Sequence, residues 1–94
     1  MPSYLVETYL ARDGAGERAA CERRASTAAE ALTTGTSHIR FERSIYVPED
    51  EICFFIFDAP SDRDAALAAE RAELDPIRVV EAVSSVNSRL EEEE

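Results

Sequence analysis

The chain has 94 residues, is 45% hydrophobic, carries a net charge of −10 and contains ten arginines but no lysine. A chain of this length forms one domain with a single modest core, and its ordinary hydrophobic content argues against wholesale disorder. The strong negative charge argues against binding to nucleic-acid phosphates or to anionic membranes.

The chain shows no targeting or membrane signal. No apolar stretch approaches the ~20 residues that a membrane-spanning helix needs. The N-terminal residues, MPSYLVETYL, lack the positive region and the cleavage site of a secretory signal, so we expect a cytoplasmic protein. Cys21 and Cys53 have no zinc-binding spacing, which predicts two buried thiols. We expect one domain over residues 1–84 and an acidic tail over residues 85–94.

The first predicted elements are a strand and a helix. Residues 4–9 (YLVETY) alternate and are rich in β-branched and aromatic side chains, which favours a strand. Residues 16–33 are rich in Ala, Glu and Arg, which favour a helix. A stripe of mostly small side chains should let this helix lie close to a sheet: Cys21, Ala25, Ala28 and Leu32. Gly35 is expected to stop it in a left-handed conformation.

Two further strands are predicted around an acidic turn, PEDE. Residues 38–47 alternate again. One face of this strand is expected to hold Ile39, Phe41, Arg43, Ile45 and Val47, and the other His38, Arg40, Glu42, Ser44 and Tyr46. Residues 52–57 (ICFFIF) are apolar on both faces, which is typical of a central strand.

The last predicted elements are a helix and a strand. Ser61 followed by Asp64 resembles a capping box, so a helix should run from there to about Glu73. Its small inward face is expected to be Ala65, Ala66, Ala69 and Ala72. Pro76 ends this helix, and residues 77–83 (IRVVEAV) favour a strand because β-branched residues dominate. A helical alternative also exists, with an apolar heptad stripe at Val79, Val83, Val86 and Leu90.

The order β-α-β-β-α-β predicts an α+β fold, the ferredoxin-like plait. This is a four-stranded antiparallel sheet with two helices on one face. The strands over residues 4–9 and 52–57 should be central, in keeping with their apolar character. The opposite face of the sheet is left bare and needs a cover. A second copy of the chain is the simplest cover, so we expect a homodimer.

Three segments resemble a family of small bacterial ferredoxin-like proteins, mostly of unknown function, and the resemblance covers residues 3–83. The segments are YLVE, RSIYVPEDEICFFIFDAP and AELDPIRVVEAV. Typical members resemble Y-x-V-E-R in the first strand, S-Y-V-x-x-D before a third strand with Cys, A-P before the second helix, and G-L-P before the last strand. Here Ile45 is inserted between Ser44 and Tyr46, and Glu73 stands in place of Gly.

One branch of this family is described as dimeric and nickel-binding. The resemblance therefore implies a homodimer that binds Ni²⁺ or another divalent metal, with no organic cofactor. Nickel prefers imidazole and other nitrogen or oxygen donors. The chain has one histidine, His38, so the family's metal ligands cannot be transferred to it residue by residue. His38 and Glu7 are the candidate metal ligands here.

Glu7 is the most informative single residue, because a carboxylate in a central strand needs a cation, a metal or water as its partner. Arg40 and Arg43 are its expected partners, since they lie on a strand of the same sheet. Tyr9 and Tyr46 could line a pocket between the bare sheet and its cover. The candidate ligand-binding residues are thus Glu7, Tyr9, Arg40, Arg43 and Tyr46. A structural ion pair is the simpler interpretation of Glu7.

Three functions remain open at this point. The first is a homodimeric module that binds a divalent metal or a small ligand. The second is a cofactor-independent dimeric α/β-barrel enzyme, of oxygenase, isomerase or cyclase type, that acts on a small organic molecule. It needs a paired acid and base, such as Glu7 with His38 or an Arg. The third is an interaction protein whose bare face or acidic tail binds another protein. The chain has no phosphate-binding loop and no nucleophile elbow.

Overall fold

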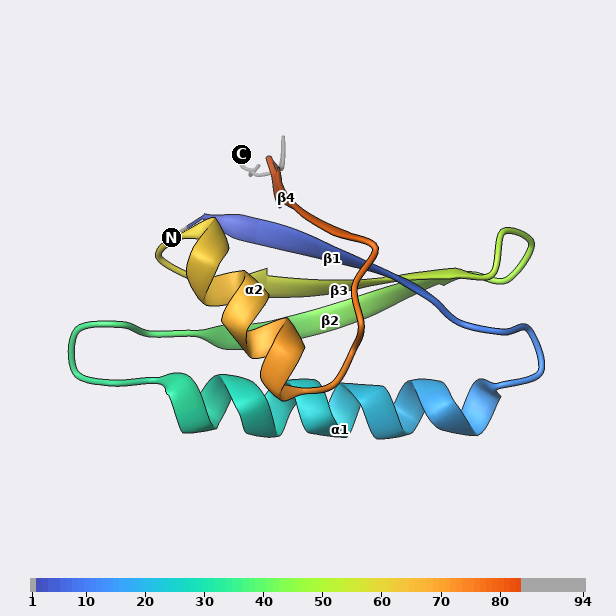
Figure 1. The fold of residues 1–94 in the computed structure, drawn as a ribbon, viewed down its shortest axis with the longest axis horizontal. Coiled ribbons are helices and arrows are strands. Elements are labelled where there is room, and N and C mark those ends of the chain that lie inside the picture. Colours follow the sequence, from blue (N-terminus) through green and yellow to red (C-terminus); the bar gives the residue numbers. More distant parts are fainter. Residues whose placement is uncertain (1, 84–94) are drawn as a thin grey trace, which may run out of the picture.

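The computed structural model describes residues 2–83 and shows the predicted plait (Figure 1). Its elements are β1 (Ser3–Tyr9), α1 (Ala15–Leu32), β2 (Arg40–Val47), β3 (Ile52–Asp58), α2 (Asp62–Arg71) and β4 (Arg78–Ala82). The strand interpretation of the last segment is confirmed, whereas Val86, Leu90 and the predicted acidic tail lie outside the described residues. Neither helix in the described part of the chain is long and apolar enough to cross a membrane.

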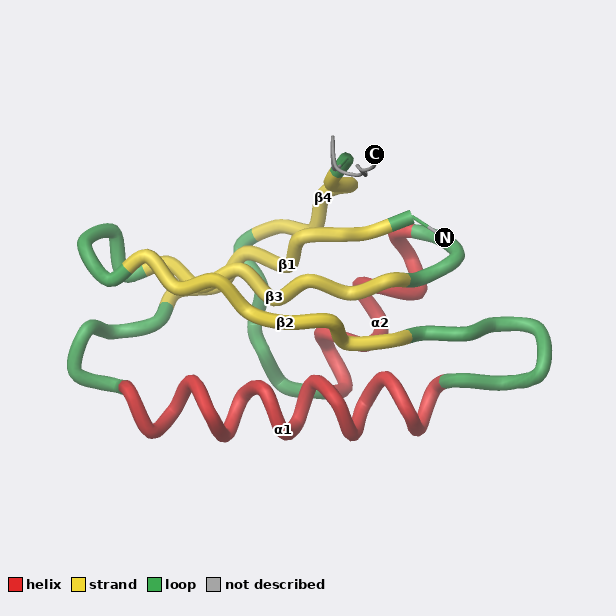
Figure 2. The backbone as a smooth tube through the Cα atoms, turned by 180° about the vertical axis from the view of Figure 1, so that it is seen from behind, coloured by secondary structure: helices red, strands yellow, loops and turns green. Residues whose placement is uncertain are grey.

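The strands form one antiparallel sheet in the order β2-β3-β1-β4, so the two most apolar strands are central, as predicted. Both helices lie on the same side of this sheet. Figure 2 shows the strands in front of α2 when the molecule is seen from behind. The opposite face of the sheet, called the open face below, has no covering element among the described residues.

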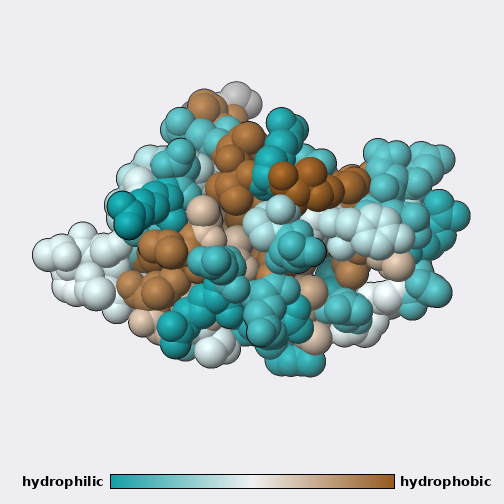
Figure 3. All heavy atoms as spheres, in the orientation of Figure 1, coloured by the Kyte–Doolittle hydropathy of each residue, from teal (hydrophilic) through white to brown (hydrophobic). Residues whose placement is uncertain are grey.

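The core lies between the helices and the sheet. Val6, Cys53, Phe55 and Phe57 are almost completely buried on the helix-facing side. Burial of such a side chain stabilises the fold by about 1.5–3 kcal/mol. The helices contribute mainly small side chains to this core: Cys21, Ala25, Ala28 and Ala29 from α1, and Ala65, Ala68 and Ala69 from α2. On the helix side hydrophobic and hydrophilic residues are interspersed at the surface (Figure 3).

Both cysteines are buried and unpaired, as predicted. The stripe of α1 is also confirmed, with Leu32 packed against its edge. The inward face of α2 is corrected in one position. Ala66 is exposed and Ala68 is buried, because the buried positions 65, 68, 69 and 72 follow the i, i+3, i+4, i+7 spacing of one helix face.

The prediction for Gly35 is wrong. No glycine has a positive φ among the described residues, and α1 ends at Leu32, followed by Thr33 in an extended conformation. The Thr33 hydroxyl caps the end of α1 instead. It donates to the Ala29 carbonyl at 2.8 Å and accepts from the Ile39 amide at 3.1 Å. One side chain thus satisfies both the helix end and the chain that returns to β2.

A left-handed stop occurs instead at the end of α2. Glu73 has a φ of 59°. Its amide donates to the Glu70 carbonyl and the Leu74 amide donates to the Ala69 carbonyl, both at 3.0 Å. This is the Schellman pattern, which usually places glycine where Glu73 stands. In the family motif that the sequence resembles, glycine stands at the position of Glu73.

A β-bulge in β2 overturns the predicted faces of that strand. Phe41 lies opposite Phe57 but Arg43 lies opposite Ile56, so Glu42 is the extra residue. One inserted residue moves every later side chain to the other face. Ser44 and Tyr46 therefore point to the helix side, whereas Arg43, Ile45 and Val47 lie on the open face.

Candidate functional site

The candidate site is the open face of the sheet. Strand alternation and register assign its residues. They are Ser3, Leu5, Glu7 and Tyr9 from β1, Arg40, Glu42, Arg43, Ile45 and Val47 from β2, Ile52, Phe54, Ile56 and Asp58 from β3, and Arg78, Val80 and Ala82 from β4. Four of the five predicted ligand-binding residues lie here, namely Glu7, Tyr9, Arg40 and Arg43.

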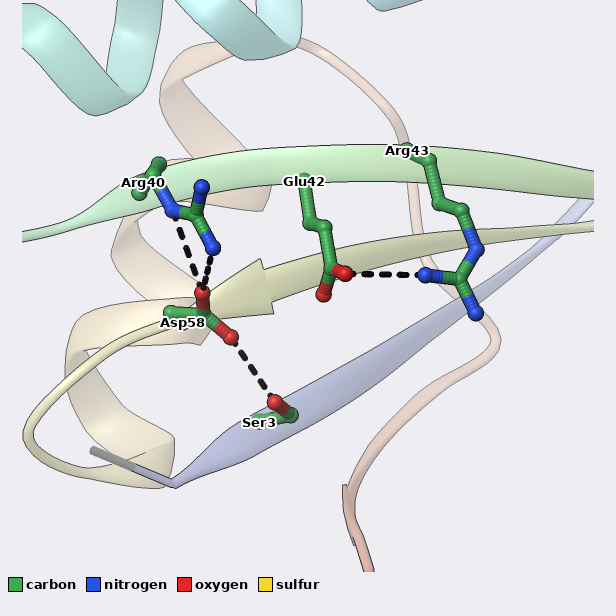
Figure 4. A network of polar contacts seen from close by, with 5 residues as sticks. All are labelled: Ser3, Arg40, Glu42, Arg43 and Asp58. Carbon is green, nitrogen blue, oxygen red and sulfur yellow. Dashed lines mark hydrogen bonds and ion pairs between the residues drawn. The ribbon is translucent and has the colours of Figure 1, made fainter. Parts of the chain in front are cut away.

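One end of the open face carries a polar network that spans three strands (Figure 4). Arg40 donates through Nε and Nη2 to one oxygen of Asp58, at 3.2 and 2.6 Å. The Ser3 hydroxyl donates to the other oxygen at 2.8 Å. Beside them, Arg43 donates to Glu42 at 2.8 Å. The bulge makes this last pair possible, because it places two successive residues of β2 on the same side of the sheet.

Asp58 is the best-held carboxylate of this network. Its partial burial opposes ionisation, but the hydrogen bonds from Arg40 and Ser3 outweigh that effect and lower the pKa of Asp58. The side chain of Asp58 is 13% exposed, whereas that of Arg40 is 61% exposed. Asp58 therefore stays charged at neutral pH and fixes one arginine at the edge of the face.

Glu7 is paired, but not with the residues that the sequence suggested. Its carboxylate accepts from Arg78 of β4 at 2.7 Å, whereas Arg40 binds Asp58 and Arg43 binds Glu42. The prediction that the arginines of β2 satisfy Glu7 is wrong. Register explains the error, because Glu7 lies directly opposite Arg78 and its other neighbour is Phe54 of β3.

The centre of the open face is apolar. The rows across the strands place Ile45 next to Phe54, and Leu5 between Ile56 and Val80. Ile45 is 44% exposed and Tyr9 is 63% exposed. A hollow of about 160 Å³ lies at the boundary between the apolar centre and the polar network, lined by Ser3, Glu42, Arg43, Ile56, Ala82 and Val83. The face thus offers apolar contact area with a guanidinium, a carboxylate and a hydroxyl beside it.

Tyr46, the fifth predicted ligand-binding residue, lies on the helix side. Its hydroxyl donates to the carbonyls of Leu10 and Ala11, at 3.0 and 3.1 Å. Burial, with a contribution from Glu51, raises the pKa of Tyr46. Arg18 lies over its ring at 5.7 Å. Tyr46 therefore anchors the loop after β1 and takes no part in the open face.

A second polar cluster lies beneath α1. The Ser44 hydroxyl donates to Glu22 and accepts from Arg18 Nε at 3.0 Å, and Arg18 also donates to the Ser44 carbonyl. Burial raises the pKa of the neighbouring Cys53 thiol, which keeps it protonated and unreactive. This cluster joins α1 to the edge strand β2, so its role is to stabilise the fold.

His38 lies apart from Glu7. It precedes β2 by two residues and lines a hollow of about 290 Å³ between the end of α1 and the start of β2. Arg40 pairs with Asp58 of β3, which in turn pairs with Ser3 of β1. Ser3 and Glu7 are four residues apart, which is about 13 Å along β1. The two predicted metal ligands therefore do not meet within one chain.

The described residues of one chain do not fit a nickel ion. Residues 2–83 contain no group of three or more His, Cys, Asp or Glu side chains that could hold a metal. The carboxylate of Glu7 is already bound by Arg78. The same separation leaves the enzyme alternative without its acid–base pair of Glu7 and His38 in one chain. Nickel binding and catalysis stay predictions that depend on a second copy.

Three residues of the open face were missed by sequence reasoning: Ser3, Asp58 and Arg78. The sequence held one signal for Asp58, since a charged residue ended the most apolar strand. Nothing in the sequence linked Arg78 to Glu7, because the two are 71 positions apart and only the β1–β4 register joins them.

The chain matches no protein-family model, and comparisons with curated proteins and with solved structures find no match. The function is therefore inferred from the geometry of the open face.

Proposed function

We propose that the protein is a homodimer whose two copies meet through their open faces and hold a small organic ligand between them. The observation that carries this proposal is the charge of the face. Its strand residues include three arginines and three acidic residues, so their charges sum to 3 − 3 = 0, whereas the whole chain has a net charge of −10.

A chain this acidic repels a second copy at most orientations. The open face offers an approach with little repulsion, since all three ion pairs of residues 2–83 lie on it. Apolar residues occupy its centre, with the paired charges towards the β4 edge and one end of the strands. An apolar centre with a polar rim is the usual composition of a protein–protein interface. Tyr and Arg, both enriched in interfaces, are present as Tyr9, Arg40 and Arg43.

The ligand part of the proposal is supported by the hollow beside Ser3 and Arg43. Two such hollows, one from each copy, would be enclosed when the faces meet. Beside the apolar Ile56 and Ala82, the guanidinium of Arg43 keeps donors that Glu42 does not take, and these suit a small molecule with an apolar body and an acceptor group such as a carboxylate. Glu42 and the Ser3 hydroxyl, whose proton is already donated to Asp58, can accept from a donor group of the same molecule.

The dimer is tested with two matched substitutions. Ile45→Glu places a charge in the apolar centre, and Leu67→Glu places one on the outer surface of α2, where Leu67 is 42% exposed and Ile45 is 44% exposed. Sedimentation equilibrium should show a dimer for the wild type and for Leu67→Glu, and a monomer for Ile45→Glu. A monomeric wild type, or an Ile45→Glu variant that still dimerises, would contradict the proposal.

The ligand is tested by NMR with a panel of small aromatic and aliphatic carboxylic acids. Binding should shift the amide signals of Leu5, Arg43 and Ile56 in the wild type and leave those of monomeric Ile45→Glu unchanged. A wild-type dimer that binds none of these acids would overturn the ligand part while leaving the dimer intact.

A further inference from the structure

We propose that the groove between α1 and α2 is a binding site for a small phosphate-bearing molecule, separate from the open face. The groove measures about 240 Å³ and is lined by Arg23, Arg24, Thr27, Ala28 and Arg71. It contains three arginines and no acidic residue. The chain as a whole has twice as many acidic residues as arginines, 20 against 10, so this composition is the reverse of the average surface.

The three guanidinium groups keep donors that form no hydrogen bond with the described residues. Six of the nine arginines in residues 2–83 donate side-chain hydrogen bonds there: Arg12, Arg18, Arg24, Arg40, Arg43 and Arg78. Arg23 and Arg71 donate none to these residues, and none of the three arginines of the groove forms an ion pair with them. Three like charges around one groove repel one another, and a bound anion would remove that cost.

Arg24 is held in place for such a role. Its Nε donates to the Ala72 carbonyl at 2.8 Å, and one terminal nitrogen contacts Cys21 Sγ at 3.4 Å. The other terminal nitrogen makes no hydrogen bond to the described residues and keeps its two donors. An arginine that is already fixed loses less conformational freedom on binding than an unrestrained one.

The spacing on α1 brings the remaining donors to the same groove. Thr27 follows Arg23 by four residues and Arg24 by three, so all three lie on adjacent turns of one helix face. Ala28 is buried and contributes only a small side chain, which leaves room for a tetrahedral anion. Arg71 completes the set from α2. Guanidinium groups with a nearby hydroxyl match the acceptor oxygens of a phosphate.

The dipole of α2 explains only part of this arrangement. Its C-terminal end favours cations, which accounts for Arg71 in the last turn and for Arg24 on the Ala72 carbonyl. It does not account for Arg23, which belongs to the middle of α1. The convergence of all three on one groove is therefore the feature that a ligand would explain.

The test is an NMR titration of the full chain with inorganic phosphate, phenyl phosphate and citrate, each at constant ionic strength set with chloride. We expect saturable shifts of the amides of Arg23, Arg24, Thr27 and Arg71 with both phosphates. The substitutions Arg23→Gln and Arg71→Gln should each weaken binding by about tenfold, as expected for loss of a charged hydrogen bond. Both residues are exposed, so the fold should tolerate these changes.

Arg63→Gln is the matched control, because it removes the same charge from an exposed position of α2 that lies outside the groove. It should change the affinity by less than about twofold, since screening weakens the effect of a distant charge. Shifts that do not saturate, equal losses in Arg63→Gln and Arg71→Gln, or tighter binding of citrate than of either phosphate would overturn the proposal. Phosphate binding that occurs only after Glu91–Glu94 are all changed to Gln would also overturn it, in favour of the chain's own acidic tail as the occupant.

Discussion

Glu7 holds the start of β4 in two ways. Its carboxylate accepts from Arg78 Nε at 2.7 Å, and its backbone carbonyl accepts from the Ile77 amide at 2.6 Å. A residue in a central strand thus fixes the last strand of the sheet, through the side-chain hydrogen bond with the widest sequence separation within residues 2–83. This double role is a structural explanation for a carboxylate on an otherwise apolar part of the face.

The ion pair itself should contribute little to stability. The side chain of Arg78 is 64% exposed, and exposed pairs are typically worth about 0.2–1 kcal/mol. A double-mutant cycle with Glu7→Gln and Arg78→Gln, measured by urea unfolding, should give a coupling energy within that range. A coupling well above it would mean that the pair is buried in solution, as it would be inside a dimer. Repeating the cycle in the Ile45→Glu background distinguishes the two cases.

Acid should remove a stabilising contribution of Asp58. Its pKa is lower in the folded protein than in the unfolded chain, so its contribution is fully present above the unfolded value of about 3.9 and is lost as the pH falls through the folded value. Urea unfolding from pH 7 downwards should therefore show wild type and Asp58→Asn converging in stability at acidic pH. Asp50→Asn, in the exposed turn after β2, is the control and should run parallel to the wild type.

Glu73→Gly should stabilise the protein. Glu73 adopts a left-handed conformation at a helix end, where glycine has no Cβ penalty. We expect a gain of about 0.5–1 kcal/mol in the free energy of unfolding, because the left-handed penalty of about 1–2 kcal/mol exceeds the entropic cost of glycine, about 0.5–1 kcal/mol. Glu70→Gly, which removes the same charge from within α2, should instead lose about 1 kcal/mol. If both substitutions change stability in the same direction, the backbone explanation of Glu73 is wrong.

We expect the nickel uptake that the family resemblance implies to require the dimer. His38 and Glu7 do not meet in one chain, and no group of three metal-binding side chains occurs in residues 2–83. Native mass spectrometry with Ni²⁺ should show a fixed number of ions on the wild-type dimer, none on the monomeric Ile45→Glu variant and none on His38→Ala. An ion bound by the monomer would contradict a site shared between copies.

Local patterns in the sequence determined the order and type of every element. The alternation in residues 4–9, the apolar run in residues 52–57 and the small stripe of α1 are periodic signals that depend only on near neighbours. Their order, with the right-handed crossovers of such folds, was sufficient for the plait and for the choice of its central strands. The bare face of the sheet followed from the same reasoning, as did the shared face of Glu7 and Tyr9, whereas alternation alone separates Arg40 from Arg43.

Only the tertiary structure decided which charges meet. The bulge at Glu42 reverses the faces of β2, and no local pattern reveals it because the extra residue is defined by the pairing with β3. Arg78 reaches Glu7 through strand register, and Arg23 meets Arg71 through the packing of two helices. Contacts of this kind depend on long-range geometry, in which a shift of one residue changes the partner of every side chain.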